Sequence, residues 1–145
     1  MCELCSVSRR SMLAALAGAA TLVIGPAEAA SAEGHRAFVA QAFAMKQRAI
    51  DSGDQAFGAV VVRGGEIVGF GPSRVVVKKD WTAHAEREAI RDAQARLSRI
   101  ELADCVMYST SRPCSACEQA AAQARLARMY AGADANDLGA PRLRQ

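Results

Sequence analysis

Apolar residues between positions 33 and 70 recur at spacings that predict one helix and two strands. Residues 33–52 place apolar side chains on one helical face, as an amphipathic helix does. Residues 57–62 form an unbroken apolar run, which is typical of a strand buried on both faces. Residues 63–66 read Arg-Gly-Gly-Glu and predict a tight turn into a second strand over residues 67–70.

The rest of the chain continues with alternating helices and strands. The order helix–strand–strand–helix–strand–helix–strand predicts an α/β fold, with helices packed against a mixed sheet. The remaining elements expected from the pattern are a loop at 71–80, a helix at 83–97 with Thr82 as its N-cap, a strand at 105–109, a helix from about 114 to about 126 and a strand at 127–131.

Composition bounds the domain and its partners. The chain has 145 residues, 51% of them hydrophobic, which suffices for one domain with a single core. The formal net charge is +3, and acidic and basic residues are interspersed. This charge gives no indication of a nucleic-acid partner.

Residues 1–32 have a different pattern and predict an export signal. Residues 8–10, Ser-Arg-Arg, precede an apolar stretch over residues 12–25, and small residues follow at 27–32. This arrangement resembles a twin-arginine signal peptide with an A-x-A-like cleavage site. We therefore expect a mature domain of residues 33–145 in the periplasm, or in the cytoplasm if the signal is not used.

The apolar stretch of this segment is shorter than the roughly 20 residues that span a bilayer. We therefore expect no stable membrane span in the mature form. Two alternatives stay open for the segment, an ordinary N-terminal helix and an uncleaved membrane anchor. Cys2 and Cys5 precede the arginine pair and would leave with a cleaved signal.

Two short motifs carry the candidate chemistry. His84-Ala85-Glu86 is followed by Pro113-Cys114-Ser115-Ala116-Cys117. A catalytic zinc ion usually has three protein ligands and an open fourth position, which makes His84, Cys114 and Cys117 the candidate ligands. Glu86 is the candidate catalytic carboxylate. Two other interpretations of these residues fit less well. A structural zinc site normally has a fourth protein ligand, and none is evident. A redox cysteine pair would leave His84 and Glu86 unexplained.

With these motifs, residues 57–131 resemble the cytidine deaminase-like superfamily, whose signature is H-x-E followed by P-C-x-x-C. Residues 80–86, Asp-Trp-Thr-Ala-His-Ala-Glu, are most similar to its guanine deaminase and tRNA adenosine deaminase branch. The resemblance implies a three-layer α/β fold with a mixed sheet and helices on both faces. It also implies bound Zn²⁺ that activates water, with Glu86 as the group that moves protons.

The resemblance also identifies candidate substrate contacts, which are Phe57, Ser73, Trp81 and Ala85. Three positions depart from the family's usual residues: Ser73 stands in place of Asn, Trp81 in place of Pro, and Arg112 in place of Glu. The chain ends soon after its fourth expected strand, where relatives add further elements. We expect a homodimer whose neighbouring subunit helps to close the pocket.

Three functions follow from these observations. The leading hypothesis is hydrolytic deamination of a free nucleobase or nucleoside, with a small molecule as partner. A tRNA-specific adenosine deaminase is the alternative enzyme, although an export signal and the modest charge make a nucleic-acid partner unexpected. A catalytically silent zinc-binding interaction module is the non-enzymatic alternative.

Overall fold

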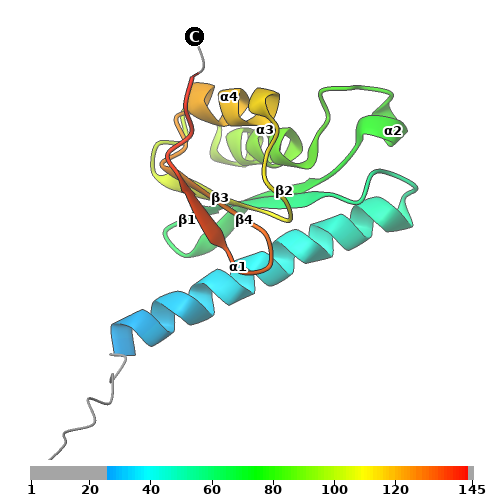
Figure 1. Ribbon diagram of the computed structural model, residues 1–145. Helices are drawn as coiled ribbons and strands as arrows, with labels where there is room; N and C mark the ends of the chain where they lie inside the picture. The colour runs from blue at the N-terminus through cyan, green and yellow to red at the C-terminus, as the bar shows by residue number, and fades with distance from the viewer. Residues whose placement is uncertain (1–25, 144–145) are drawn as a thin grey trace, which may run out of the picture.

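Helix α1 (Pro26–Asp51) covers one face of a five-stranded sheet, and helices α3 (Ala85–Leu97) and α4 (Ser115–Gln123) cover the other (Figure 1). The computed structural model describes residues 26–143, with side chains from residue 31 onward. The expected α/β fold with helices on both faces of a mixed sheet is confirmed. Residues 1–25, which include the arginine pair, lie outside the described residues.

The sheet has the strand order β2-β1-β3-β4-β5, and only β3 and β4 are parallel neighbours. Strands β1 and β2 form the expected hairpin. Both glycines of its turn, Gly64 and Gly65, have positive φ angles of 54° and 86°, which suits a tight two-residue turn. The strands are β1 (Gly58–Arg63), β2 (Glu66–Pro72), β3 (Cys105–Ser109), β4 (Arg128–Ala131) and β5 (Asn136–Gly139).

Strand β1 is buried on both faces, as its apolar run predicts. Ala59 and Val61 pack in the core under α3 and α4, whereas Val60 and Val62 pack in the core under α1. All four are at most 3% exposed. Since successive side chains of a strand point to opposite faces, one segment serves two cores, and the central position of β1 follows from its sequence.

Several elements differ from the sequence prediction. Helix α1 is already helical at Pro26, the first described residue, so the expected cleavage region at 27–32 falls inside this helix. The expected loop at 71–80 contains a helical turn, α2 (Val75–Lys78). A fifth strand, β5, follows β4 and pairs with it in antiparallel fashion. Two of its four residues are exposed, so this polar edge strand lacks the apolar alternation that would reveal it in the sequence.

The N-cap of α3 is His84, and the prediction of Thr82 is wrong. Thr82 donates hydrogen bonds from its backbone N–H and its hydroxyl to the Asp80 carboxylate, at 2.8 and 2.7 Å. The threonine is therefore part of a turn that precedes the helix. The helix starts after this turn, at Ala85, with His84 as its N-cap.

Helix α3 lies unusually close to β2, because Gly71 carries no side chain. A Cβ atom at Gly71 would lie 2.0 Å from the Ala85 carbonyl oxygen and 2.5 Å from the Ala89 amide nitrogen. Both are backbone atoms of α3 and cannot rotate away. The glycine thus fixes where the first turn of α3 lies against the sheet.

Within residues 26–143, we find no helix with the length and apolar character needed to cross a membrane.

Gly71→Ala should lower the free energy of unfolding by about 3 kcal/mol, at the upper end of the usual cost of overpacking. Gly34→Ala is the matched control, since its added methyl group would meet only the Phe38 ring, at 3.9 Å. Within α1 that change should be neutral or stabilise by up to about 1 kcal/mol. Urea unfolding of both variants tests this, and equal effects would contradict the close approach of α3 to β2.

Candidate metal centre and its cavity

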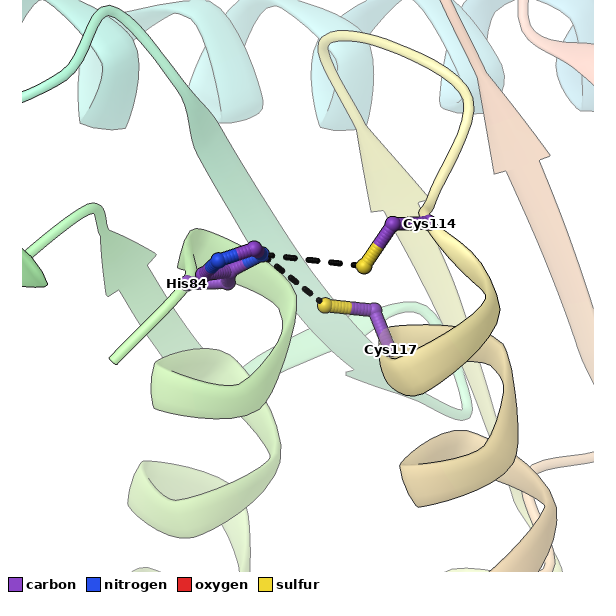
Figure 2. Close-up of side chains that lie close together, drawn as sticks. All are labelled: His84, Cys114 and Cys117. Carbon is purple, nitrogen blue, oxygen red and sulfur yellow. Dashed lines mark hydrogen bonds between the residues drawn. The ribbon is translucent and has the colours of Figure 1, made fainter. Parts of the chain in front are cut away.

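Two helix N-termini bring the predicted ligands together. His84 is the N-cap of α3 and Cys114 is the N-cap of α4, and Cys117 lies in the first turn of α4. The His84 Nδ1 atom lies 3.7 Å from Cys114 Sγ and 3.5 Å from Cys117 Sγ. Figure 2 shows the three side chains pointing toward one another from the ends of the two helices.

These distances fit a tetrahedral zinc ion. With Zn–S bonds of about 2.3 Å and Zn–N bonds of about 2.0 Å, two tetrahedral ligands lie about 3.6 Å apart. The three donor atoms all lie within 4.8 Å of one another. One imidazole nitrogen and two sulfurs are also a donor set that zinc favours. Within residues 26–143, no other group of three such side chains is close enough to hold an ion.

The three candidate ligands differ in burial, and the buried Cys117 needs a nearby cation to be a thiolate. Cys117 is buried, His84 is partly buried and Cys114 is exposed. Burial raises the pKa of the Cys117 thiol above its ordinary value, and the nearby Glu86 carboxylate raises it further. A cation beside the sulfur reverses both effects. The N-terminal ends of α3 and α4 add the positive ends of their dipoles, which also favour a thiolate.

Glu86 lies next to the three donors but is not one of them. It is in the first turn of α3, is 7% exposed and lies close enough to Cys117 to interact with its thiol. The carboxylate thus contacts one candidate ligand and lines the same cavity as the other two, His84 and Cys114. Its role as the catalytic carboxylate stays a prediction from the sequence.

A cavity of about 130 Å³ opens beside the donors and Glu86. Of the substrate contacts expected from sequence, Phe57, Ser73 and Ala85 line it, and so does Arg112. Phe57 remains 44% exposed, whereas Ser73 is 1% exposed. Trp81 does not line this cavity and is 85% exposed.

Two further residues, Gln55 and Ser111, line the cavity and were not predicted from the sequence. Gln55 lies just before β1, and Ser111 lies between β3 and α4. Strands β1 and β3 are antiparallel neighbours in the sheet, so the segment before β1 and the loop after β3 meet at the same end of these two strands. The position of Ser111 just before the Pro113-Cys114 motif is the one signal that could have identified it.

Comparison with known proteins places the chain in a family. A family model described as the cytidine and deoxycytidylate deaminase zinc-binding region matches residues 32–133. Guanine deaminase from Bacillus subtilis (strain 168) is 35% identical over 104 residues, which cover 71% of this chain and 67% of the relative. The tRNA-specific adenosine deaminase from Aquifex aeolicus (strain VF5) is 37% identical over 93 residues, which cover 64% of this chain and 62% of the relative.

Solved structures agree with these sequence matches. The X-ray structure of the Bacillus subtilis guanine deaminase gives a TM-score of 0.66 at 35% identity, covering 68% of this chain and 64% of that one. A tRNA:A34 deaminase structure gives 0.64 at 32% identity, covering 66% and 70%. The sheet and its helix layers therefore match the cytidine deaminase-like fold. Since the family model spans both zinc-ligand motifs and most of the chain, the chain belongs to the cytidine and deoxycytidylate deaminase family.

Proposed function

We propose that the protein is a zinc-dependent hydrolytic deaminase of a free nucleobase or nucleoside. In this reaction water and the substrate's exocyclic amino group become a ring carbonyl and ammonia. The observation that carries the proposal is the position of Glu86, beside three zinc donors and on the wall of a cavity. The two groups that hydrolytic deamination requires, a zinc site and a carboxylate, thus lie at the same cavity.

The roles of the chain's own residues follow from that geometry. When bound, zinc supplies Lewis-acid activation of water at neutral pH. Glu86 accepts one proton from the attacking water at its carboxylate oxygen and delivers it to the ring nitrogen. It then accepts the second proton of the same water and delivers it to the departing amine, which leaves as ammonia. Because a carboxylate can take a proton and give it back, one residue serves both halves of the reaction.

The cavity supports a single heterocyclic base as the reacting group. Its volume of about 130 Å³ is below the roughly 300–1,000 Å³ of pockets that hold drug-sized ligands. Phe57 offers an aromatic face on which a base stacks. Trp81 is too exposed to belong to the wall, and we propose that it covers a ligand only at the outer rim. The expected homodimer stays a prediction, which light scattering of the purified protein checks.

Deamination of adenosine in tRNA is the second candidate. It is favoured by the 37% identity to the Aquifex aeolicus tRNA-specific adenosine deaminase and by the likeness to a tRNA:A34 deaminase structure. The same zinc donors and Glu86 would serve both substrates. The two candidates therefore differ in what surrounds the base and not in the chemistry.

Glu86→Gln should abolish turnover and retain zinc, because glutamine keeps the shape of the side chain but cannot carry the proton. Ammonia release is measured with free bases, nucleosides and a tRNA anticodon stem-loop. The expected loss is at least about 100-fold, the lower end of general acid–base contributions. Glu88→Gln is the control on the same helix, since Glu88 pairs with Lys78 and Arg91 and lies outside the cavity.

The panel separates the candidate functions. Turnover of one base or nucleoside that Glu86→Gln removes supports the leading proposal. Turnover of the stem-loop alone, with binding that weakens steeply as salt rises, supports the tRNA candidate. Zinc binding without turnover of any substrate supports the silent module and contradicts both enzymes.

Loss of a ligand should empty the metal site. His84→Ala and Cys114→Ala should each reduce the zinc content from about one ion per chain to near zero, since two remaining ligands hold zinc poorly. Cys105→Ala is the matched control, because Cys105 is buried in the core away from the site. Metal analysis by plasma mass spectrometry tests this. Full zinc content in the His84 or Cys114 variant would contradict the proposed ligand set.

We also propose that residues 1–32 direct export of the protein. The support is the Ser-Arg-Arg sequence at 8–10 and the apolar stretch that follows it. Changing Arg9 and Arg10 together to lysine should prevent delivery to the periplasm, because a twin-arginine signal is read as a specific motif and not as a charge. Cell fractionation measures the outcome, with Arg36→Lys as the control. Equal periplasmic amounts of the variant and the parent would exclude a twin-arginine route.

A further inference from the structure

Ser73 is a nearly buried polar residue in the wall of the cavity. It follows β2, lines the cavity with His84 and Glu86, and is 1% exposed. Its backbone N–H donates to the Phe57 carbonyl at 3.1 Å, and the next residue, Arg74, donates its N–H to the Ala83 carbonyl at 2.9 Å. The serine is therefore anchored between the cavity wall and the segment that leads to His84.

Asp54, in the loop between α1 and β1, fixes the Ser73 hydroxyl by a hydrogen bond. The Ser73 Oγ–H donates to Asp54 Oδ1 at 2.8 Å. The Val76 and Val77 N–H groups donate to Asp54 Oδ2 at 3.0 and 2.9 Å. The Gln55 N–H donates to Oδ1 at 2.7 Å. Each carboxylate oxygen thus accepts two hydrogen bonds.

Asp54 is an acceptor only. Desolvation raises its pKa, but the hydrogen bonds from the Val77, Gln55 and Val76 N–H groups and from the Ser73 hydroxyl outweigh it and hold the pKa of Asp54 below its usual range. The carboxylate is therefore ionised at neutral pH and has no proton to give. It must receive the hydroxyl proton of Ser73.

A serine hydroxyl has one proton and two acceptor lone pairs. Since Asp54 takes the proton, Ser73 Oγ has only lone pairs to offer a ligand in the cavity that the residue lines. We propose that Asp54 is a positioning residue that fixes Ser73 as a hydrogen-bond acceptor, so that the site selects a base with a ring N–H facing Ser73. This inference rests on the proposed function and adds a substrate class, namely bases with an unsubstituted ring N–H on that edge.

The selection is strong because the position is nearly buried. A buried acceptor left without a donor costs about 1–3 kcal/mol, and sites built around a substrate donor reject analogues that lack it by large factors. A base whose ring N–H is replaced by N–CH₃ leaves Ser73 unpaired. A base that presents a lone pair there meets another lone pair.

Asp54→Asn tests the assignment, because it reverses the polarity of Ser73. The amide oxygen keeps the larger number of backbone donors when it accepts from the Val76 and Val77 N–H groups. The amide NH₂ then lies toward Ser73, and only the hydrogen bond from the Gln55 N–H is lost. Asparagine then donates to Ser73 Oγ and frees the hydroxyl proton to point into the cavity. Asp51→Asn is the matched control, since Asp51 lies at the exposed end of α1 and accepts from the Gln47 side chain.

The measurement is the dissociation constant of each free base and of its analogues methylated at single ring nitrogens. It uses the zinc-loaded Glu86→Gln protein, with and without Asp54→Asn, and kcat/KM in the Glu86 background where turnover occurs. At one ring position we expect methylation to weaken binding at least tenfold more when Asp54 is present than in the Asp54→Asn variant. Ser73→Ala should remove the same preference, and Asp51→Asn should retain it.

Failure of this inference differs from failure of the proposed function. Equal methylation penalties with and without Asp54→Asn, or no base bound by the protein that retains Asp54, would overturn the role of Asp54. The expected preference in binding, together with no turnover in the Glu86 background, would keep that role and contradict the deaminase. Thermal unfolding of each variant identifies any that is not folded, and Ser73→Ala then supplies the test.

Discussion

The structure depends on the convergence of two helix starts on one metal. His84 and Cys114 occupy N-cap positions, yet neither side chain caps its own helix. A side chain that caps a helix at this position is typically worth about 1 kcal/mol. Here the two side chains face each other, and a zinc ion bound by both would offset that loss at both helices. Metal binding would therefore also stabilise the position of α3 against α4.

The two faces of the sheet carry separate cores, and only one of them lies beside the candidate site. The face under α1 is an apolar core that includes Ala42, Met45 and Tyr108. The face under α3 and α4 carries a second core, and the candidate zinc donors and the cavity lie where these two helices begin. The close contact at Gly71 fixes the distance between the first turn of α3 and strand β2. Since Glu86 lies in that turn, backbone packing sets where its side chain starts.

Local signals in the sequence identified His84, Cys114, Cys117 and Glu86 as candidates and predicted the order of the first strands, and the structure brings the three candidate metal ligands within 4.8 Å of one another. His84 and Glu86 are two residues apart, and Cys114 and Cys117 are three apart, so each pair belongs to a single helix start. The interpretation of Thr82 as a cap was wrong because its hydroxyl instead bonds to Asp80 in the preceding turn. Strand β5 was missed because an edge strand needs no apolar alternation.

What the sequence could not show depends on contacts between distant segments. Asp54 and Ser73 are 19 positions apart and meet only because the β1–β2 hairpin returns the chain to the end of α1. Gln55 and Ser111 reach the cavity because β1 and β3 are neighbours. No spacing rule predicts such meetings, since they follow from the tertiary arrangement of the loops.

We expect three protein ligands to hold zinc and to leave its fourth position open. X-ray absorption at the zinc edge of the metal-loaded protein tests it most directly. The expected spectrum has two sulfur ligands at about 2.3 Å, one imidazole nitrogen at about 2.0 Å and one further light atom that small anions exchange. A closed shell of four protein ligands, or a shell without two sulfurs, would rule out an open catalytic site of this kind.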